Sequence, residues 1–191
     1  MYFQSLDDKS ECVGIYAHGK LHFDELPEDL TKTWRHSGAI LDNEVEYAWI
    51  RAGGKNLAEV CPEQLAQKLA ANQSKFKAYL QSFRIARINL RELCFYDLVP
   101  EDFLLEFCET KNQITKFVFE NCEKPSNYEH LAKVHKLLYK MKYRDFDINN
   151  KDCRQMLANT RDRTQINRLI NGPKHIDYNL FGTITGRLTT F

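Results

Sequence analysis

The sequence predicts a protein of mixed α and β structure (α+β or α/β), with short strands near the N-terminus and several helices after them. Alternating side chains and glycine turns mark the first 60 residues, and apolar residues recur at helical steps further along. With 43% hydrophobic and 28% charged residues, 8 glycines and 5 prolines, the composition is globular. A length of 191 residues allows one medium domain or two small ones.

Two short strands are expected at residues 12–17 and 21–23, joined by a glycine turn at Gly19. A third strand is expected at residues 45–50, where Tyr47 and Trp49 alternate with smaller or charged residues. Gly53 and Gly54 end it. The first strand of the chain is expected at residues 12–17. These residues contain no acidic side chain that could hold a metal ion.

Four helices are expected after the strands. The first runs from Pro62 to about residue 87, and the second follows Pro100 and continues to about residue 118. The third covers residues 128–143, and a fourth, rich in arginine, covers residues 152–170. Residues 176–185 are expected to be extended.

The domain boundary is expected in the segment 121–127, where Pro125 interrupts the helical pattern. Residues 6–124 then form an α/β domain and residues 125–191 a second, mainly helical one. Residues 1–5 are set aside, because Tyr2-Phe3-Gln4-Ser5 is similar to the remnant of a protease-cleavable tag.

Charge and cysteine content bear on partners and location. Residues 131–191 carry 12 basic and 5 acidic side chains, whereas the first 60 carry 6 and 11, so a polyanion partner is indicated for the C-terminal third.

The six cysteines are dispersed without metal-ligand spacing, which predicts reduced thiols in the cytoplasm. No stretch approaches the about 18–20 apolar residues of a membrane span, and no membrane partner is expected.

The segment Thr183-Ile-Thr185-Gly186-Arg187-Leu188-Thr189-Thr190, preceded by an extended stretch with Tyr178, resembles the Thr-Gly-Arg motif of family A DNA-directed DNA polymerases, particularly the phage branch. In that family the arginine reaches into the minor groove at the primer end. The resemblance implies that Arg187 reads the groove and that Gly186 allows close approach. It also implies that the DNA backbone is contacted by the hydroxyl groups of Thr185, Thr189 and Thr190.

Two other stretches resemble the same family. Residues 141–149 resemble, in their pattern of apolar and acidic residues, the motif that opens the polymerase domain. Asp145 stands in place of its glycine and Asn149 in place of its final acidic residue. Phe107-Cys108-Glu109-Thr110-Lys111 resembles the last motif of the family's RNase H-like 3′–5′ exonuclease domain, with lysine where that motif has a metal-binding aspartate. An ammonium group repels Mg²⁺. The resemblance therefore implies a degenerate exonuclease domain, followed by the start of a palm and thumb.

The resemblance implies a nucleotidyltransferase of DNA replication that adds deoxynucleotides to a primer 3′ end with Mg²⁺. The family's catalytic carboxylates follow the Thr-Gly-Arg motif, so these 191 residues are expected to be an N-terminal fragment, inactive alone, without bound metal and monomeric. Residues 152–170 are expected to form a short thumb. Its basic side chains are predicted to contact DNA phosphates without regard to sequence: Arg154, Arg161, Arg163, Arg168 and Lys174.

Two other functions are compatible with the sequence. A non-catalytic adaptor would use the same basic end to bind nucleic acid or an acidic protein. An active metal-dependent exonuclease would use Asp42 and Glu44, which have the Asp-x-Glu spacing of a two-metal site, although a loop with acidic side chains before a strand is the ordinary explanation.

Overall fold

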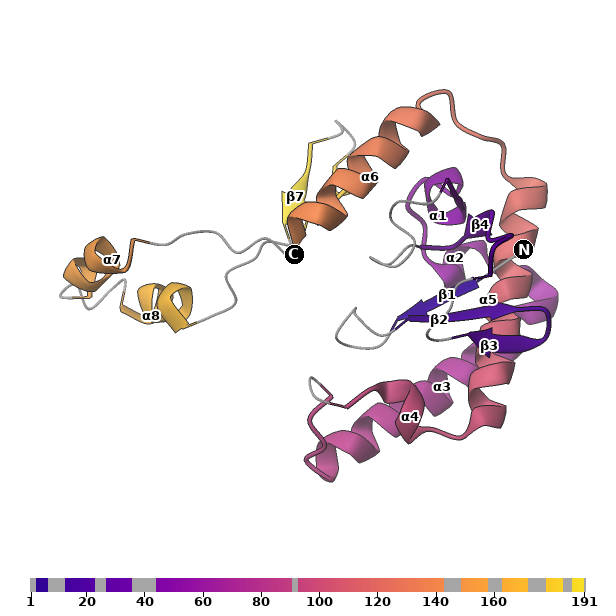
Figure 1. The fold of residues 1–191 in the computed structure, drawn as a ribbon, viewed down its shortest axis with the longest axis horizontal. Helices are drawn as coiled ribbons and strands as arrows, with labels where there is room; N and C mark the ends of the chain where they lie inside the picture. Colours follow the sequence, from indigo (N-terminus) through magenta and orange to yellow (C-terminus); the bar gives the residue numbers. More distant parts are fainter. Residues whose placement is uncertain are drawn as a thin grey trace. The chain divides into compact units, whose positions relative to one another are not determined.

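The computed structural model describes residues 3–6, 13–22, 27–35, 44–90, 93–142, 149–157, 163–171, 178–183 and 187–190. The fold is of the mixed α and β class, with long helices and small sheets (Figure 1). The chain forms two compact units, Met1–Ala132 and Lys133–Phe191. The segment 125–132, which follows the boundary expected from sequence, lies in the first of them.

The first unit contains a three-stranded antiparallel sheet of β1 (Phe3–Leu6), β2 (Val13–Ala17) and β3 (Lys20–His22). The β2–β3 hairpin is confirmed, and its turn places His18 and Gly19 at φ 51° and 76°. The expectation that residues 12–17 form the first strand is wrong. β1 precedes it, and Phe3–Leu6 pairs with Val13–Tyr16, although residues 1–5 look like a tag remnant in the sequence.

The strand expected at residues 45–50 is wrong for most of its length. Only Glu46–Tyr47 is extended, as β5, paired in parallel with β4 (Lys32–Thr33). α1 (Ala48–Arg51) follows at once, and Tyr47, Ala48, Trp49 and Ile50 are all buried, so the alternation in the sequence does not separate a buried from an exposed face. Gly53 and Gly54 end this helix at positive φ, with their amides bonded to Ile50 and Trp49.

The long helices are confirmed. α2 (Leu57–Val60) precedes α3 (Glu63–Ile85), whose N-cap is Pro62, and α4 (Phe95–Leu98) precedes α5 (Glu101–Asn121). α5 packs against β1 and β2 of the sheet and against α3 (Figure 1). The α3, α4 and α5 helices share an aromatic cluster whose ring centroids lie 4.8–6.4 Å apart: Phe76, Tyr79, Phe83, Phe95, Tyr96, Phe103 and Phe107.

One buried polar contact fixes the register of α3 against α5. The Asn72 side-chain amide donates to Thr110 Oγ1 at 3.1 Å, and that hydroxyl donates to the Glu106 carbonyl at 2.8 Å. Both Asn72 and Thr110 are fully buried, so sliding the helices would leave the Asn72 amide without this acceptor.

The cysteines differ in part from the expectation of reduced thiols. Cys61, Cys108, Cys122 and Cys153 form no disulfide, whereas Cys94 is disulfide-bonded. Within the described ranges, no helix has the length and apolar character needed to cross a membrane.

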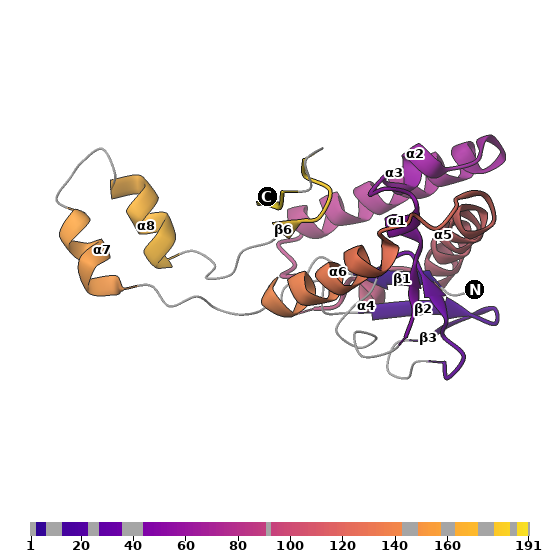
Figure 2. The same cartoon turned by 90° about the horizontal axis from the view of Figure 1, so that it is seen from above.

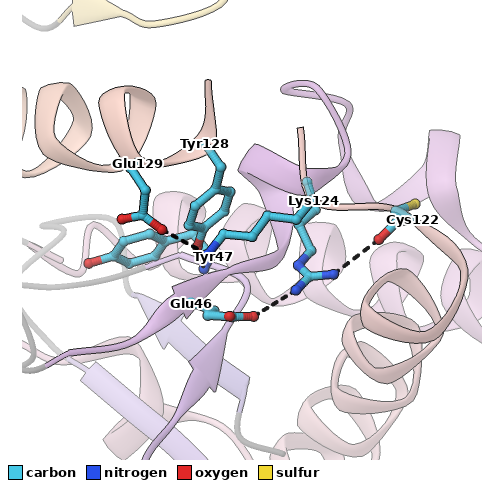
Figure 3. A network of polar contacts seen from close by, with 7 residues as sticks. Glu46, Tyr47, Cys122, Lys124, Tyr128 and Glu129 are labelled. Atoms are coloured by element: carbon cyan, nitrogen blue, oxygen red, sulfur yellow. Dashed lines mark hydrogen bonds and ion pairs between the residues drawn. The ribbon is translucent and has the colours of Figure 1, made fainter. Parts of the chain in front are cut away.

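A polar network joins the start of α6 (Tyr128–Lys142) to β5 and α1 within the first unit (Figure 3). The Tyr47 amide donates to the Tyr128 hydroxyl at 2.7 Å, and burial raises the pKa of both phenols. Arg51 donates to Glu46 at 2.9 Å and to the Cys122 carbonyl at 3.2 Å, and its guanidinium lies 5.0 Å from the Phe119 ring. These contacts hold the segment that follows α5 in place.

Replacing Tyr128 with phenylalanine is expected to lower the free energy of unfolding by about 1.5 kcal/mol, because the buried Tyr47 amide loses its acceptor. Tyr79→Phe is the matched control: its ring packs 5.0 Å from Phe103, and the variant keeps that ring, so its change should stay within about 0.5 kcal/mol. Chemical denaturation measures both. Equal stability of the two variants would contradict the role of the bond.

The second unit holds the rest of α6, two short helices and a small hairpin. α7 (Asn150–Met156) and α8 (Arg163–Asn171) lie side by side in both views (Figures 1 and 2). The single helix expected at residues 152–170 is therefore wrong, because α7 ends at Met156 and α8 begins at Arg163. β6 (Tyr178–Asn179) and β7 (Thr189–Thr190) form a two-stranded antiparallel sheet. β6 agrees with the extended start of 176–185, and a turn follows it.

Candidate nucleic-acid interface

The Thr-Gly-Arg segment returns to β6 as one side of a hairpin. Thr190 pairs with Tyr178, and Thr189 pairs with Asn179. After β6 the chain turns at Leu180 and Phe181, and Asn179 Oδ1 accepts a hydrogen bond from the Phe181 amide at 3.0 Å. An asparagine side chain that bonds the backbone two residues on is typical of a turn, so Asn179 fixes the point at which the chain reverses.

Gly182 lies against the side chain of Thr189. A Cβ atom at position 182 would overlap Thr189 Oγ1 and would come within van der Waals distance of its Cβ and Cγ2. The hairpin closes only because this residue has no side chain. Thr189, which is predicted to contact the DNA backbone, is half-buried, and its side chain lies against Gly182.

Arg187 is held at its backbone and exposed at its side chain. Its amide donates to Thr183 Oγ1 at 2.9 Å, and Thr183 Oγ1 also lies 2.9 Å from the Arg187 carbonyl, to which it can donate. The main chain of Arg187 is thus fixed by one hydroxyl, while the residue itself is exposed to solvent. Arginine keeps its charge at every physiological pH, so this position offers a permanent guanidinium.

The α7–α8 pair carries the second group of predicted contacts. α7 begins at Asn149, whose Oδ1 accepts from the Asp152 amide at 3.4 Å and from the Lys151 amide at 3.2 Å. Arg154 on α7 and Arg163 and Arg168 on α8 are all exposed, and Arg163 Nε donates to the Leu157 carbonyl at 3.2 Å. Ile166 is buried on α8, which turns the polar side of this helix outward.

The structure therefore brings the predicted residues together in two groups, the hairpin with Arg187, Thr189 and Thr190, and the helix pair with three arginines. Four predicted residues lie outside the described ranges: Arg161, Lys174, Thr185 and Gly186. The motif at residues 141–149 falls largely outside them as well.

The alternative metal site gains no support from the described part of the chain. Glu44 is exposed, and Asp42 lies outside the described residues. Among the residues whose positions are described, no group of three or more His, Cys, Asp or Glu side chains could hold a metal ion.

Sequence reasoning missed two polar residues at this interface. Thr183 fixes the backbone of Arg187, and Lys151 adds an exposed positive charge to α7. The signal for Thr183 was its spacing, since a hydroxyl four residues before the arginine can close a short loop by bonding its backbone. Lys151 could have been found as a basic residue three positions from Arg154, on the same side of a helix.

Both groups have the chemistry that phosphate recognition requires. Guanidinium groups bind phosphate through two parallel hydrogen bonds, and hydroxyl groups add further donors without specifying a base. No protein-family profile matches the chain, and neither a curated protein nor a solved structure matches it significantly.

Proposed function

We propose that this chain is the scaffold and DNA-contacting part of a template-directed DNA polymerase of the family A type, and that its second unit binds primer–template DNA. The single observation that carries the proposal is the exposed Arg187, whose backbone is fixed by two hydrogen bonds to Thr183 beside a closed hairpin. A fixed backbone with an exposed arginine suits insertion into a narrow groove of negative potential.

The α7–α8 pair supports the same proposal from a different part of the unit. Its three exposed arginines would neutralise backbone phosphates irrespective of sequence, as a polymerase requires while the template moves past it. Nucleotidyl transfer itself, with deoxynucleotides and Mg²⁺, belongs in this proposal to the parent enzyme, and the residues described here bind and position the duplex.

The test is equilibrium binding of a fluorescent primer–template duplex to the chain, measured by anisotropy at several salt concentrations. Arg187→Ala should weaken binding about tenfold, since a charged contact to DNA contributes about 1–3 kcal/mol. Arg84→Ala is the matched control, because Arg84 is an exposed arginine on α3 of the first unit. Unchanged affinity in Arg187→Ala, or an equal loss in the control, would contradict the proposal. Tighter binding to an acidic protein than to the duplex would favour an adaptor.

A further inference from the structure

An open hollow of about 400 Å³ lies on one face of α3, toward the end of the helix. The described residues that line it all belong to α3: Lys77, Leu80, Gln81, Arg84 and Ile85. Positions three, four and seven residues apart share one face of a helix. The side chains of Phe76, Tyr79 and Phe83 take another direction, into the aromatic cluster with α4 and α5, which lie beside α3 (Figure 1). The hollow therefore lies on a side of α3 that this cluster does not occupy.

Two apolar side chains take part in the hollow. Ile85 is 74% exposed, the largest fraction among the large hydrophobic residues that the structure describes, and Leu80 is half-buried. A single exposed apolar residue is ordinary on a protein surface. Two of them in one hollow, bordered by polar side chains, have the composition of a protein-binding surface, with an apolar centre and a polar rim.

The charge around the hollow is positive. Residues 64–91 contain six basic side chains and no acidic one. Two of these lysines pair with Glu106 and Glu109 of α5. The side chains of Lys77 and Arg84, in contrast, are exposed and have no hydrogen bond or ion pair in the part of the chain that the structure describes. The hollow therefore offers two accessible cations beside two apolar side chains.

This combination discriminates between kinds of polyanion. The phosphates of a nucleic acid would match Lys77 and Arg84, but its charged backbone would leave Leu80 and Ile85 without apolar partners. An acidic amphipathic helix supplies both kinds of group, because its carboxylates and apolar side chains recur at the same helical spacing. Charge and apolarity together thus favour a protein partner at this position.

We propose that this face of α3, formed by the five residues of the hollow, docks an acidic amphipathic helix of a partner protein. The apolar side chains of the partner lie on Leu80 and Ile85, and its carboxylates bind Lys77 and Arg84. Two exposed ion pairs beside a small apolar contact give weak, reversible binding, and salt weakens it further. The inference concerns the first unit and goes beyond DNA binding by the second.

The test is an anisotropy titration of the full chain, at low salt, into a fluorescent peptide in which leucines recur at helical spacing among glutamates. Saturable binding in the micromolar range is expected. Lys77→Gln/Arg84→Gln should weaken it about tenfold, because both ion pairs are lost. Ile85→Ser should also weaken it about tenfold, because the apolar contact is lost. A peptide with serine in place of every leucine should bind at least about tenfold more weakly than the first peptide.

Two matched controls separate the site from general effects of charge and apolarity. Lys20→Gln/Lys55→Gln removes the same charge from exposed lysines of the first unit outside α3. Leu169→Ser removes an apolar side chain of α8 that is 49% exposed. Both proteins should bind the peptide within about threefold of the wild type, because only long-range attraction changes.

The outcome is also separable from DNA binding. The Arg154→Gln/Arg163→Gln/Arg168→Gln protein should keep its affinity for the peptide within about threefold, and Lys77→Gln/Arg84→Gln should keep its affinity for primer–template within the same limit. A peptide that loses its binding only in the α7–α8 variant would contradict docking on α3 and leave DNA binding untouched.

Three further results would overturn the proposal. The first is no saturable binding of the glutamate–leucine peptide at concentrations up to about 1 mM. The second is equal binding of the serine peptide, or equal binding by folded Lys77→Gln/Arg84→Gln and Ile85→Ser proteins, with folding checked by circular dichroism. The third is tighter binding of phosphatidylserine–phosphatidylcholine vesicles than of the peptide, which would assign this face to a lipid surface.

Discussion

Replacement of Arg154, Arg163 and Arg168 together by glutamine is expected to weaken binding of primer–template DNA by about 100-fold at physiological salt. All three side chains are exposed on the adjacent helices α7 and α8, where each can neutralise one backbone phosphate. Loss of three such contacts should lower the slope of log affinity against log salt by about 2.7, because each contact releases about 0.9 counterion. The loss should be the same for duplexes of any sequence.

Anisotropy titrations between about 50 and 200 mM salt measure both quantities. The control removes the same net charge from the first unit, by changing three exposed residues to glutamine: Lys55, Arg84 and Arg87. The affinity of this control for primer–template DNA should fall less than about threefold, because only the long-range attraction is reduced. A salt slope that stays at the wild-type value in the α7–α8 variant would show that these arginines do not touch phosphates.

The second large effect concerns stability and pH. Because burial and Arg35 lower the pKa of Lys111 from 10.5 to about 8, the unfolded chain binds more protons than the folded chain between these two values. Stability therefore rises with pH across this window. Below pH 8 the charged lysine costs folding free energy, so Lys111→Met should stabilise the protein by about 2 kcal/mol at pH 7, a value reduced for the partial exposure of the side chain.

Chemical denaturation of wild type and Lys111→Met at pH 7, 8, 9 and 10 measures the difference in their free energies of unfolding. This difference should shrink from pH 8 upward, because the wild-type lysine loses its proton. Lys116→Met should show no such trend, since Lys116 lies exposed on the same helix at 3.8 Å from Glu120. A constant difference between wild type and Lys111→Met at every pH would refute this explanation.

The long helices could be predicted because their periodicity is strong and their ends carry clear signals. Pro62 and Pro100 are the N-caps of α3 and α5, where a missing amide hydrogen does no harm. Apolar residues of α5 at helical spacing are buried, among them Phe103, Leu104, Ile114 and Val118. Such segments depend little on tertiary context.

Short elements were predicted less well, for physical reasons. Residues 46–49 alternate like a strand, but Ala48–Arg51 is helical and both members of the alternating pattern are buried, which only tertiary packing reveals. β1 is a four-residue strand that exists through its pairing with β2, a partner its own sequence does not specify. The sequence between α7 and α8 contains no proline or glycine that would predict a break in the helix.

The two candidate sites show the same division. The sequence singled out Arg187 by motif and the arginines of 152–170 by composition, and the structure exposes those that it describes. The hollow lined by Trp34, Arg35 and Lys111 could not be foreseen, because Arg35 and Lys111 are 76 residues apart in the sequence and meet only through packing.

A side chain at position 182 would overlap Thr189, so the two faces of the hairpin differ. Neighbouring residues of a strand point to opposite sides, so Thr189 turns toward the glycine while Thr190 turns away from it. A strand of nucleic acid that lies along one side can reach one of these two hydroxyls and not both. The hairpin is therefore two-sided: Thr189 is half-buried on the side that faces Gly182, and Thr190 is exposed on the other side.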